Sequence, residues 1–439
     1  MQPYSYKDSG IEWLGEIPKH WKVDRIKDVS QLREDKVKVN SEERNYLELE
    51  DMEQGTGQIV SFRDTTEVVS AVMKFRKGDV LFGKLRPYLA KYYYALEDGL
   101  CTGEILAIEP IRLDGKYLKY FIGGPNFIEQ CTVNSYGAKM PRVNWNTQIG
   151  TFSIPLPPLR EQEAIAAYLE KTCARIDRIL AIKEEQLKKI EEHLEMKISQ
   201  YVTIGISETN ATKTTNYPWI HKVNATWSIS PLKRALAEKL KYGANESAED
   251  EIKEHPRYIR ITDFDKSGSL KADTFKSLPP EVAEPYMLQD GDVLFARSGA
   301  TVGKTFIFTG YDGQACFAGY LIKANTLRYK LLPEFLYYFT KSRSYSEWKN
   351  LIFTQATIQN IGADKYQYLQ LPLPPVSEQE EIIRVIKDIE SKTNLLAQNL
   401  DKQIITLKAY RKSLIHECVT GKKQIAEMVK EKEESDLHG

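Results

Sequence analysis

The chain has 439 residues, more than one ordinary hydrophobic core supports, so two or more domains are expected. With 42% hydrophobic and 28% charged residues, the composition is that of a folded globular protein and excludes wholesale disorder. The 61 basic and 61 acidic residues cancel, which argues against a strong non-specific nucleic-acid binder, because such proteins usually carry a basic excess. A sequence-specific reader with clustered basic residues stays compatible with this balance.

Membrane, metal and cofactor roles are not indicated. No apolar run reaches membrane-spanning length, and the polar first ten residues lack the core of a signal peptide. The five cysteines are scattered without metal-ligand spacing, which predicts thiols in a reducing cytoplasm, and the six histidines form no metal-spaced pair. We therefore expect no metal and no cofactor in this chain.

Short runs of β-forming residues lie between turn residues in the first half, which predicts an α/β domain with a β-rich centre. The runs are Asp79 to Phe82, Tyr92 to Leu96 and Ile105 to Ile108. The tyrosines of the second run could stack on DNA, but tyrosines in a strand are more typical of core packing.

The segment that leaves the first of these strands is basic. It carries Lys84, Arg86 and Lys91 in a loop that begins at Gly83. A basic residue that follows a strand into such a loop can reach a phosphate or a guanine edge. We predict that all three residues contact DNA; the alternative is an ordinary solvated turn.

A second candidate stretch, residues 134–142, lies in a loop between helical regions. It is rich in side chains that form hydrogen bonds, and Tyr136, Lys139 and Arg142 are its predicted DNA contacts. Helix capping and turn formation would explain the same residues without DNA, and the pattern alone does not decide between the two.

A proline-rich element, Pro-Leu-Pro-Pro at 155–158, ends the first domain. From Glu161 to about Ile204 the chain has no proline or glycine, and apolar residues recur at heptad spacing, which predicts one long helix. We interpret the proline element as structural, with Glu161 placed favourably in the first helical turn.

The second half repeats these elements in the same order. Pro-Leu-Pro-Pro recurs 217 residues later, Gly-Asp-Val-Leu-Phe at 78–82 recurs 213 residues later, and weaker matches begin at Trp227 and Tyr258. Four collinear matches indicate two homologous halves. A second long helix is predicted at 375–425, with seven of ten heptad positions apolar and Arg411 among the exceptions. Helices this long need a partner, so antiparallel packing is expected; two helices on separate domains are the alternative.

The second half has its own candidate contacts. At the common offset Arg297 matches Lys84, and the stretch before the proline element again contains amide side chains, which suit adenine. The predicted contacts are Arg297, Ser298, Thr301, Lys304, Gln355, Thr357 and Gln359. Residues 299–305 look like a phosphate-binding loop, but three residues rather than four separate the glycines, so nucleotide binding is not expected.

Three features together resemble the specificity subunits of type I restriction–modification enzymes. They are Gly-Glu-Ile-Pro-Lys-His-Trp at 15–21, the Gly-Asp-Val-Leu-Phe element of each half, and the Pro-Leu-Pro-Pro-x-x-Glu-Gln-Glu entry to each long helix. The resemblance covers about residues 10 to 425. Each motif is moderately specific, and their order and duplication are strongly specific.

The resemblance implies two homologous α/β target-recognition domains separated by two long antiparallel coiled-coil helices, in a pseudo-twofold duplicated arrangement. The domains would read the two parts of a split site in double-stranded DNA. Methyltransferase subunits, two of them, would methylate adenine with S-adenosylmethionine, and restriction subunits would cleave DNA with ATP and Mg²⁺, so this chain would hold no catalytic site. The predicted boundaries are 1–157 and 208–374 for the domains, 158–207 and 375–425 for the helices, and 426–439 for a charged tail. The N-terminal segment is expected beside the far end of the second helix.

Two other classes of protein remain open. An enzyme with an unrecognised site would bind S-adenosylmethionine or cut DNA as a purified chain. A protein-binding scaffold would fit the zero net charge, and a substitution at Arg297 would then disrupt a partner complex without lowering DNA affinity.

Overall fold

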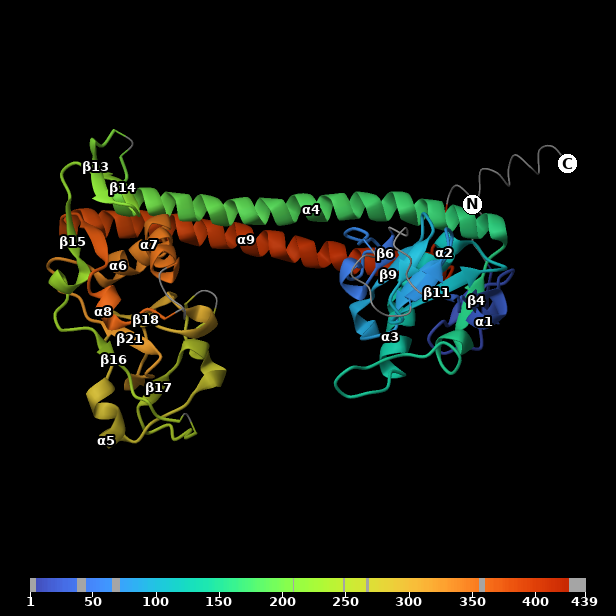
Figure 1. Cartoon of the computed structure of the whole chain (residues 1–439), viewed down its shortest axis with the longest axis horizontal. Coiled ribbons are helices and arrows are strands. Elements are labelled where there is room, and N and C mark those ends of the chain that lie inside the picture. The colour runs from blue at the N-terminus through green and yellow to red at the C-terminus, as the bar shows by residue number, and fades with distance from the viewer. Residues whose placement is uncertain are drawn as a thin grey trace. The chain divides into compact units, whose positions relative to one another are not determined.

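The computed structural model describes residues 5–37, 45–64, 72–207, 209–247, 249–265, 268–354 and 360–425. Contacts divide the chain into two compact units, one made of Met1–Glu184 with Asp401–Gly439 and the other of Glu185–Leu400. Two long helices, α4 (Leu159–Thr203) and α9 (Val376–Val419), contribute to both units (Figure 1). No helix in the described ranges is both long and apolar enough to cross a bilayer.

The first unit is built on two four-stranded sheets, of order β4-β11-β8-β9 and β5-β7-β10-β6, that share a hydrophobic core. Helices α2 and α3 pack on the other face of the first sheet (Figure 1). The strands are β1 (Tyr6–Asp8), β2 (Glu16–Pro18), β3 (Lys22–Arg25), β4 (Ser30–Leu32), β5 (Lys36–Val37), β6 (Tyr46–Leu47), β7 (Val72–Phe75), β8 (Val80–Gly83), β9 (Tyr92–Tyr94), β10 (Gly99–Cys101), β11 (Ile105–Pro110) and β12 (Ser153–Leu156). The helices are α1 (Ile26–Val29), α2 (Gly115–Ile122) and α3 (Pro125–Val133).

The second unit repeats this topology. Its central sheet has the order β16-β21-β18-β19, and β15 pairs with β22 as β3 pairs with β12. The parallel pair β17 and β20 corresponds to the parallel pair β6 and β10. The strands are β13 (Thr212–Tyr217), β14 (Ile220–Asn224), β15 (Ser228–Pro231), β16 (Lys241–Tyr242), β17 (Arg257–Ile259), β18 (Asp292–Ala296), β19 (Thr305–Phe308), β20 (Ala315–Phe317), β21 (Leu321–Ala324) and β22 (Gln370–Leu373). The helices are α5 (Pro280–Ala283), α6 (Pro333–Thr340), α7 (Arg343–Thr354) and α8 (Ala363–Tyr366). The predicted duplication and fold class are confirmed.

The Gly-Asp-Val-Leu-Phe element owes its composition to a turn and a strand buried on both faces. Gly78 has φ +95°, which favours glycine, and the Asp79 carboxylate accepts the Arg76 backbone N–H at 2.8 Å. In β8, Val80 and Phe82 enter one hydrophobic core and Leu81 enters another, so the strand reads as a continuous apolar run.

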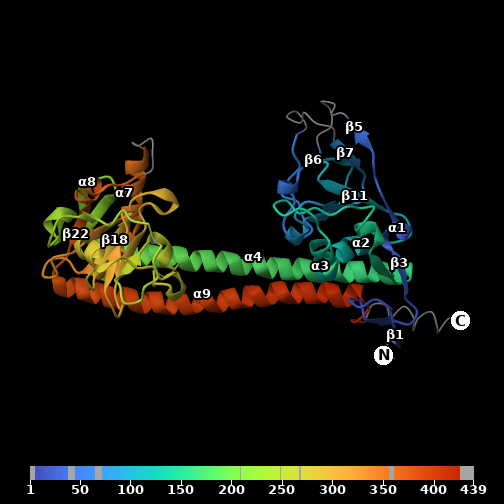
Figure 2. The same cartoon turned by 90° about the horizontal axis from the view of Figure 1, so that it is seen from below.

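Within the first unit, α4 and the C-terminal part of α9 lie side by side and run antiparallel (Figures 1 and 2). Asp177 of α4 pairs with Arg411 of α9 at 2.8 Å, and Glu184, later in α4, pairs with the earlier Lys408 at 2.9 Å. Leu169 and Leu414 are buried in one core with the domain. The predicted antiparallel pairing is therefore confirmed in this unit, and the helices also pack on the domain.

The same antiparallel pairing recurs within the second unit. Ile198 and Tyr201, near the end of α4, share a hydrophobic core with Ile382 and Ile386, near the start of α9. Each helix thus begins on one domain and ends in the other unit's core. This arrangement explains why the heptad stripe extends over the whole length of both helices.

The N-terminal segment lies at the end of α9, as expected. The Tyr6 hydroxyl donates to the Gly421 carbonyl at 3.1 Å, and β1 is seen beside the end of α9 (Figure 2). Deeper in the first unit, the Tyr117 hydroxyl donates to the Val419 carbonyl at 3.1 Å. All five cysteines are buried free thiols.

Candidate nucleic-acid interface

The two candidate stretches of the first half meet in the structure. Lys84 leaves β8, and its backbone carbonyl accepts the Val143 N–H at 3.1 Å. The Arg86 N–H donates to the Pro141 carbonyl at 2.7 Å, and Leu85 forms an antiparallel bridge with Arg142. We call residues 84–91 the strand-exit segment and residues 134–142 the pre-proline stretch. Separate loops in the sequence thus form one continuous surface.

The backbone of this surface is constrained. Arg86 and Ala90 are the two non-glycine residues with positive φ in the described ranges, at +51° and +47°, and they flank the short 3₁₀ turn Pro87–Leu89. Positive φ is uncommon for residues with a side chain and points to a turn held by its surroundings. The constraint presents the exposed Arg86 side chain outward.

The predicted contacts of the first half differ in how far they are already engaged. Lys84, Arg86, Lys139 and Tyr136 make no side-chain hydrogen bond or ion pair in the described part of the chain, and Tyr136 is 56% exposed. By contrast, the Arg142 guanidinium pairs with Glu104 at 3.1 Å.

Lys91 is engaged as well, because its ammonium donates to the Leu49 carbonyl. The side chains without a partner, those of Lys84, Arg86, Tyr136 and Lys139, are therefore available to a ligand. Arg142 and Lys91 would first have to leave a protein partner. Tyr92 and Tyr93 are buried in the core, as their strand position predicted.

The second half repeats this arrangement. Arg297 occupies the place of Lys84, and its carbonyl accepts the Ile361 N–H at 2.9 Å, while Ser298 forms an antiparallel bridge with Asn360. The Ala296 carbonyl accepts the Gly303 N–H at 2.8 Å across the hairpin. Gln355, Thr357 and Gln359 lie outside the described residues, between the end of α7 and Asn360.

Arg297 is the most constrained of the predicted contacts. Its guanidinium carbon lies 4.8 Å from the centroid of the Tyr242 ring, and the Tyr242 hydroxyl accepts the Ala363 N–H at 2.9 Å. The buried Nε of Arg297 has no hydrogen-bond partner among the described residues. A cation–π contact holds the guanidinium near the ring and leaves its terminal nitrogens able to donate hydrogen bonds. Sequence reasoning missed Tyr242, because nothing local marks it as the neighbour of Arg297.

Thr301 and Lys304 lie at the hairpin turn between β18 and β19. Both line a cavity of about 670 Å³, together with Lys349 of α7. The residues that resembled a phosphate-binding loop are part of this turn: Gly299–Thr301 forms a 3₁₀ turn and β19 begins at Thr305. A phosphate-binding loop leads into a helix, whereas this one leads into a strand.

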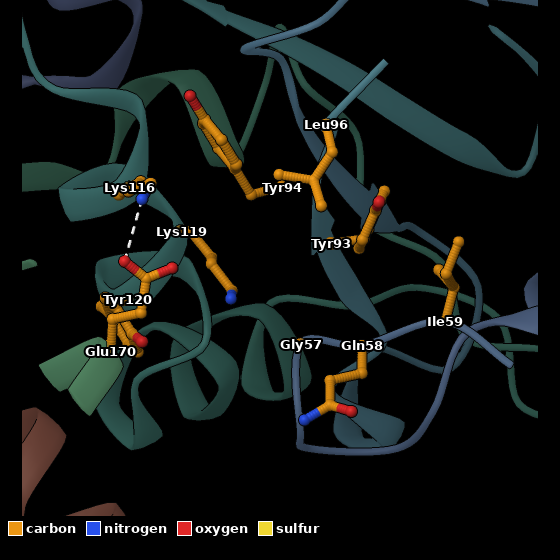
Figure 3. A pocket seen from close by; sticks show the side chains of 10 residues that line it. All are labelled: Gly57, Gln58, Ile59, Tyr93, Tyr94, Leu96, Lys116, Lys119, Tyr120 and Glu170. Atoms are coloured by element: carbon orange, nitrogen blue, oxygen red, sulfur yellow. Dashed lines mark hydrogen bonds and ion pairs between the residues drawn. The ribbon is translucent and has the colours of Figure 1, made fainter. Parts of the chain in front are cut away.

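A smaller cavity, of about 300 Å³, lies in the first unit between α2, β9 and the loop at Gln58 (Figure 3). Lys116 pairs with Glu170 at 2.9 Å, and Lys119 extends into the space alongside Tyr94 and Gln58. Burial lowers the pKa of Lys119, and the Glu170 carboxylate partly offsets this effect. Lys119 has no ion-pair partner within the described ranges.

The proline element of each half is tied to the start of a long helix. The Glu161 carboxylate accepts the buried Trp21 indole N–H at 2.9 Å, and Glu378 accepts that of Trp227 at 2.6 Å. Each Glu thus ties the start of a long helix to the strand that pairs with the proline element. No group of three or more His, Cys, Asp or Glu side chains suited to a metal ion occurs in the part of the chain that the structure describes.

Comparison with known proteins agrees with this architecture. A chain from a study of complex assembly and conformational transition of the type I R-M system has a TM-score of 0.69 at 18% identity, covering 92% of this chain and 98% of that one. The EcoDI specificity subunit of Escherichia coli is 27% identical over 170 residues, or 38% of each chain.

The putative MjaX specificity subunit of Methanocaldococcus jannaschii is 22% identical over 96% of this chain and 98% of that protein. The matches to the StySPI and EcoKI specificity subunits cover 65% and 57% of those proteins, less than two thirds of their length. The type I restriction modification DNA specificity domain matches residues 18–192 and again 232–405. The chain therefore belongs to the family defined by this DNA specificity domain and contains the domain twice.

Proposed function

We propose that this chain is the DNA sequence-specificity subunit of a type I restriction–modification complex, and that its two domains read the two halves of a split site in double-stranded DNA. The observation that carries the proposal is the repeated pairing of strand-exit segment and pre-proline stretch. In the first half the Val143 N–H, directly after the pre-proline stretch, donates to the carbonyl of Lys84, the first residue of the strand-exit segment. In the second half the Ile361 N–H donates to the Arg297 carbonyl in the same way. A conserved frame that presents different side chains suits two readers of different sequences.

Arg297 is the proposed base-reading residue of the second domain. The Arg297 guanidinium lies over the Tyr242 ring, and a guanidinium can present two parallel N–H groups, the geometry that matches the O6 and N7 acceptors of guanine. In the first domain we assign contact to Lys84, Arg86, Tyr136 and Lys139. Lys91 and Arg142 stay candidates that would exchange a protein partner for DNA.

The chemistry is proposed to lie in partner subunits. Two methyltransferase subunits would bind S-adenosylmethionine and methylate adenine, and restriction subunits would use ATP and Mg²⁺ to cleave DNA. This chain would supply the target sequence and the scaffold, without a cofactor of its own. We place the complex in the cytoplasm, where the DNA is.

Selection from a randomised duplex pool tests the proposal. The chain is combined with its methyltransferase subunit, and the retained DNA is sequenced. We expect two short half-sites at a fixed gap. Arg297→Ala should relax one position of one half-site, at a cost of about 1–3 kcal/mol, and Lys84→Ala should affect only the other. Lys222→Met, at an exposed position of strand β14, is the matched control.

The result that would overturn the proposal is the absence of any enrichment while the complex with the methyltransferase subunit stays intact. That outcome would favour a scaffold whose domains do not touch DNA. Hydrolysis of DNA by the purified chain alone would instead indicate an enzyme.

A further inference from the structure

The cavity beside the β18–β19 turn is the larger of the two cavities described above, and its lining is rich in cationic and hydroxyl groups. It has a volume of about 670 Å³ and is bounded by the turn, by α6 and α7, and by the segment that follows β17. Its polar lining residues include Lys271, Thr301, Lys304, Thr340, Lys341 and Ser346. Lys349 of α7 completes the set of four lysines. Such a lining suits an anion with several oxygen acceptors.

Two of the four lysines already have a protein partner for the ammonium group, and the other two have none among the described residues. Lys271 donates to the Thr262 carbonyl at 2.9 Å, and Lys341 pairs with Glu390 at 2.9 Å. Neither Lys304 nor Lys349 has a side-chain hydrogen bond or a carboxylate partner in the part of the chain that the structure describes. Among the lining residues there is one carboxylate, Asp265, against the four lysines. The Glu390 carboxylate offsets Lys341, so the cavity keeps an excess of positive charge.

The position of Lys349 is fixed by the turn itself. Gly303 has φ +80°, and a Cβ atom at this residue would collide with the methylene stem of Lys349. The buried Tyr345, one helical turn earlier in α7, donates its hydroxyl to the Gly303 carbonyl at 2.8 Å. The turn residue Gly303 therefore lets α7 approach closely, and the stem of Lys349 packs against the residue that precedes Lys304.

The first domain lacks this arrangement. Helices α6 and α7 begin 218 residues after α2 and α3, so Lys349 corresponds to Cys131, which is buried. Gly303 corresponds to Ala90 at the hairpin offset of 213. Only the second domain brings a lysine from its helix to the hairpin turn, so the pair is an addition to the shared frame.

We infer that Lys304 and Lys349 form a phosphate clamp on the DNA backbone of the half-site read by the second domain; this inference rests on the proposed function. An ammonium is a point charge without the planar fork of arginine, which suits phosphate rather than a base edge. Lys304 also lies directly across the hairpin from Ala296, the residue before Arg297. The clamp would therefore position the duplex while Arg297 reads it.

The test measures DNA affinity as a function of salt. The complex of chain and methyltransferase subunit binds the selected duplex across a series of salt concentrations, and log K is plotted against log[salt]. Lys349→Met keeps the stem on Gly303 and removes the charge. It should make the slope shallower by about 0.9 and weaken binding on the order of three- to tenfold, and addition of Lys304→Met should roughly double the change in slope. Lys349→Arg should restore the slope, and Lys222→Met should leave it unchanged.

The sequence preference separates the clamp from a base-reading role. The randomised pool should yield the same half-sites with Lys349→Met as with the parent chain, because phosphate contacts carry no sequence information. An altered half-site would show that the lysines read bases, and an unchanged slope in a complex that still binds DNA would show that they touch no phosphate. Either result would overturn the phosphate clamp and leave the proposed function standing.

Two further results are informative. Saturable binding of a free mononucleotide that Lys349→Met abolishes, with the salt slope unchanged, would assign the cavity to a nucleotide and overturn the clamp. A parent complex without any DNA affinity would overturn the proposed function, and the clamp with it.

Discussion

Gln162 joins the proline element to the start of helix α2. Its side chain is 3% exposed, its Oε1 accepts the Asp114 N–H at 2.8 Å, and its Nε2 donates to the Pro157 carbonyl at 2.8 Å. Gln379 makes the equivalent bonds to Leu332 and Pro374 in the second half. The Gln of the proline element therefore satisfies one buried carbonyl and one partly buried backbone N–H in each half, which explains its recurrence.

Gln162→Ala should destabilise the first unit by about 2–4 kcal/mol, because one partly buried backbone N–H and one buried carbonyl lose their partners. Chemical denaturation measures the difference. Gln186→Ala, at an exposed position of α4, should change the free energy of unfolding by less than about 0.5 kcal/mol. Equal effects of the two substitutions would contradict this role.

The lowered pKa of Lys119 makes the stability of the protein depend on pH. Its pKa is lowered in the folded chain because burial disfavours the charged ammonium, so the unfolded chain binds the proton more tightly. The native state should therefore gain stability as pH rises from the lowered pKa toward the unfolded value of about 10.4. Lys119→Met should stabilise the protein near neutral pH, and its advantage should shrink over that alkaline range.

Denaturation midpoints of parent and variant at a series of pH values would check this behaviour. Lys116→Met serves as the comparison, since Lys116 is paired with Glu170 and should not stabilise the protein when removed. An advantage of Lys119→Met that grows with pH would contradict the proposed cause.

At the scale of elements, helix α9 is held to the first domain by a polar contact inside the helix pair. Arg411 is 7% exposed, pairs with Asp177 of α4, and donates to the Gly55 and Thr56 carbonyls at 3.1 and 3.0 Å. One side chain therefore joins α9, α4 and a loop of the recognition domain.

Arg411→Met should destabilise the first unit by about 2–4 kcal/mol, because Asp177 and two carbonyls lose their donor. Asp177→Asn added to Arg411→Met should cost less than the sum of the single substitutions, as expected for residues in contact. Thermal or chemical denaturation of the four chains gives this coupling. Additive effects would show that the pair does not act as a unit.

The sequence predicted the elements that are encoded by a local pattern or by a motif that occurs in both halves. The strands β8 and β18, the two long helices and the duplication follow from apolar runs, heptad spacing and collinear motifs. In the sequence Arg411 stands out only as a polar residue at an apolar heptad position. Its role could not be predicted, because its partner Asp177 lies 234 residues away. Tyr242 and Lys349 were missed for the same reason. Arg142 was predicted as a DNA contact, and no local pattern shows that Glu104 pairs with it.

At the scale of the whole molecule, we expect the helix pair to set the gap between half-sites. Deletion of one heptad from each helix, residues 184–190 and 396–402, keeps the apolar stripes in register and shortens the pair by roughly 10 Å. The selected half-sites should then move closer by about three base pairs. The same deletion in α4 alone should destabilise the chain, because the helices no longer match. An unchanged gap after the double deletion would contradict a spacer role.

The first unit takes its residues from both ends of the described chain, and this has a consequence for synthesis on the ribosome. The second unit, Glu185–Leu400, is one continuous segment, so all of it has been synthesised before Arg411 and Val419 are added. The first domain can therefore form its contacts with Arg411 and Val419 only after these last residues have been synthesised. Folding should therefore finish in the reverse of the order of translation, and a chain truncated after Leu400 and released from the ribosome should protect its second domain from protease better than its first.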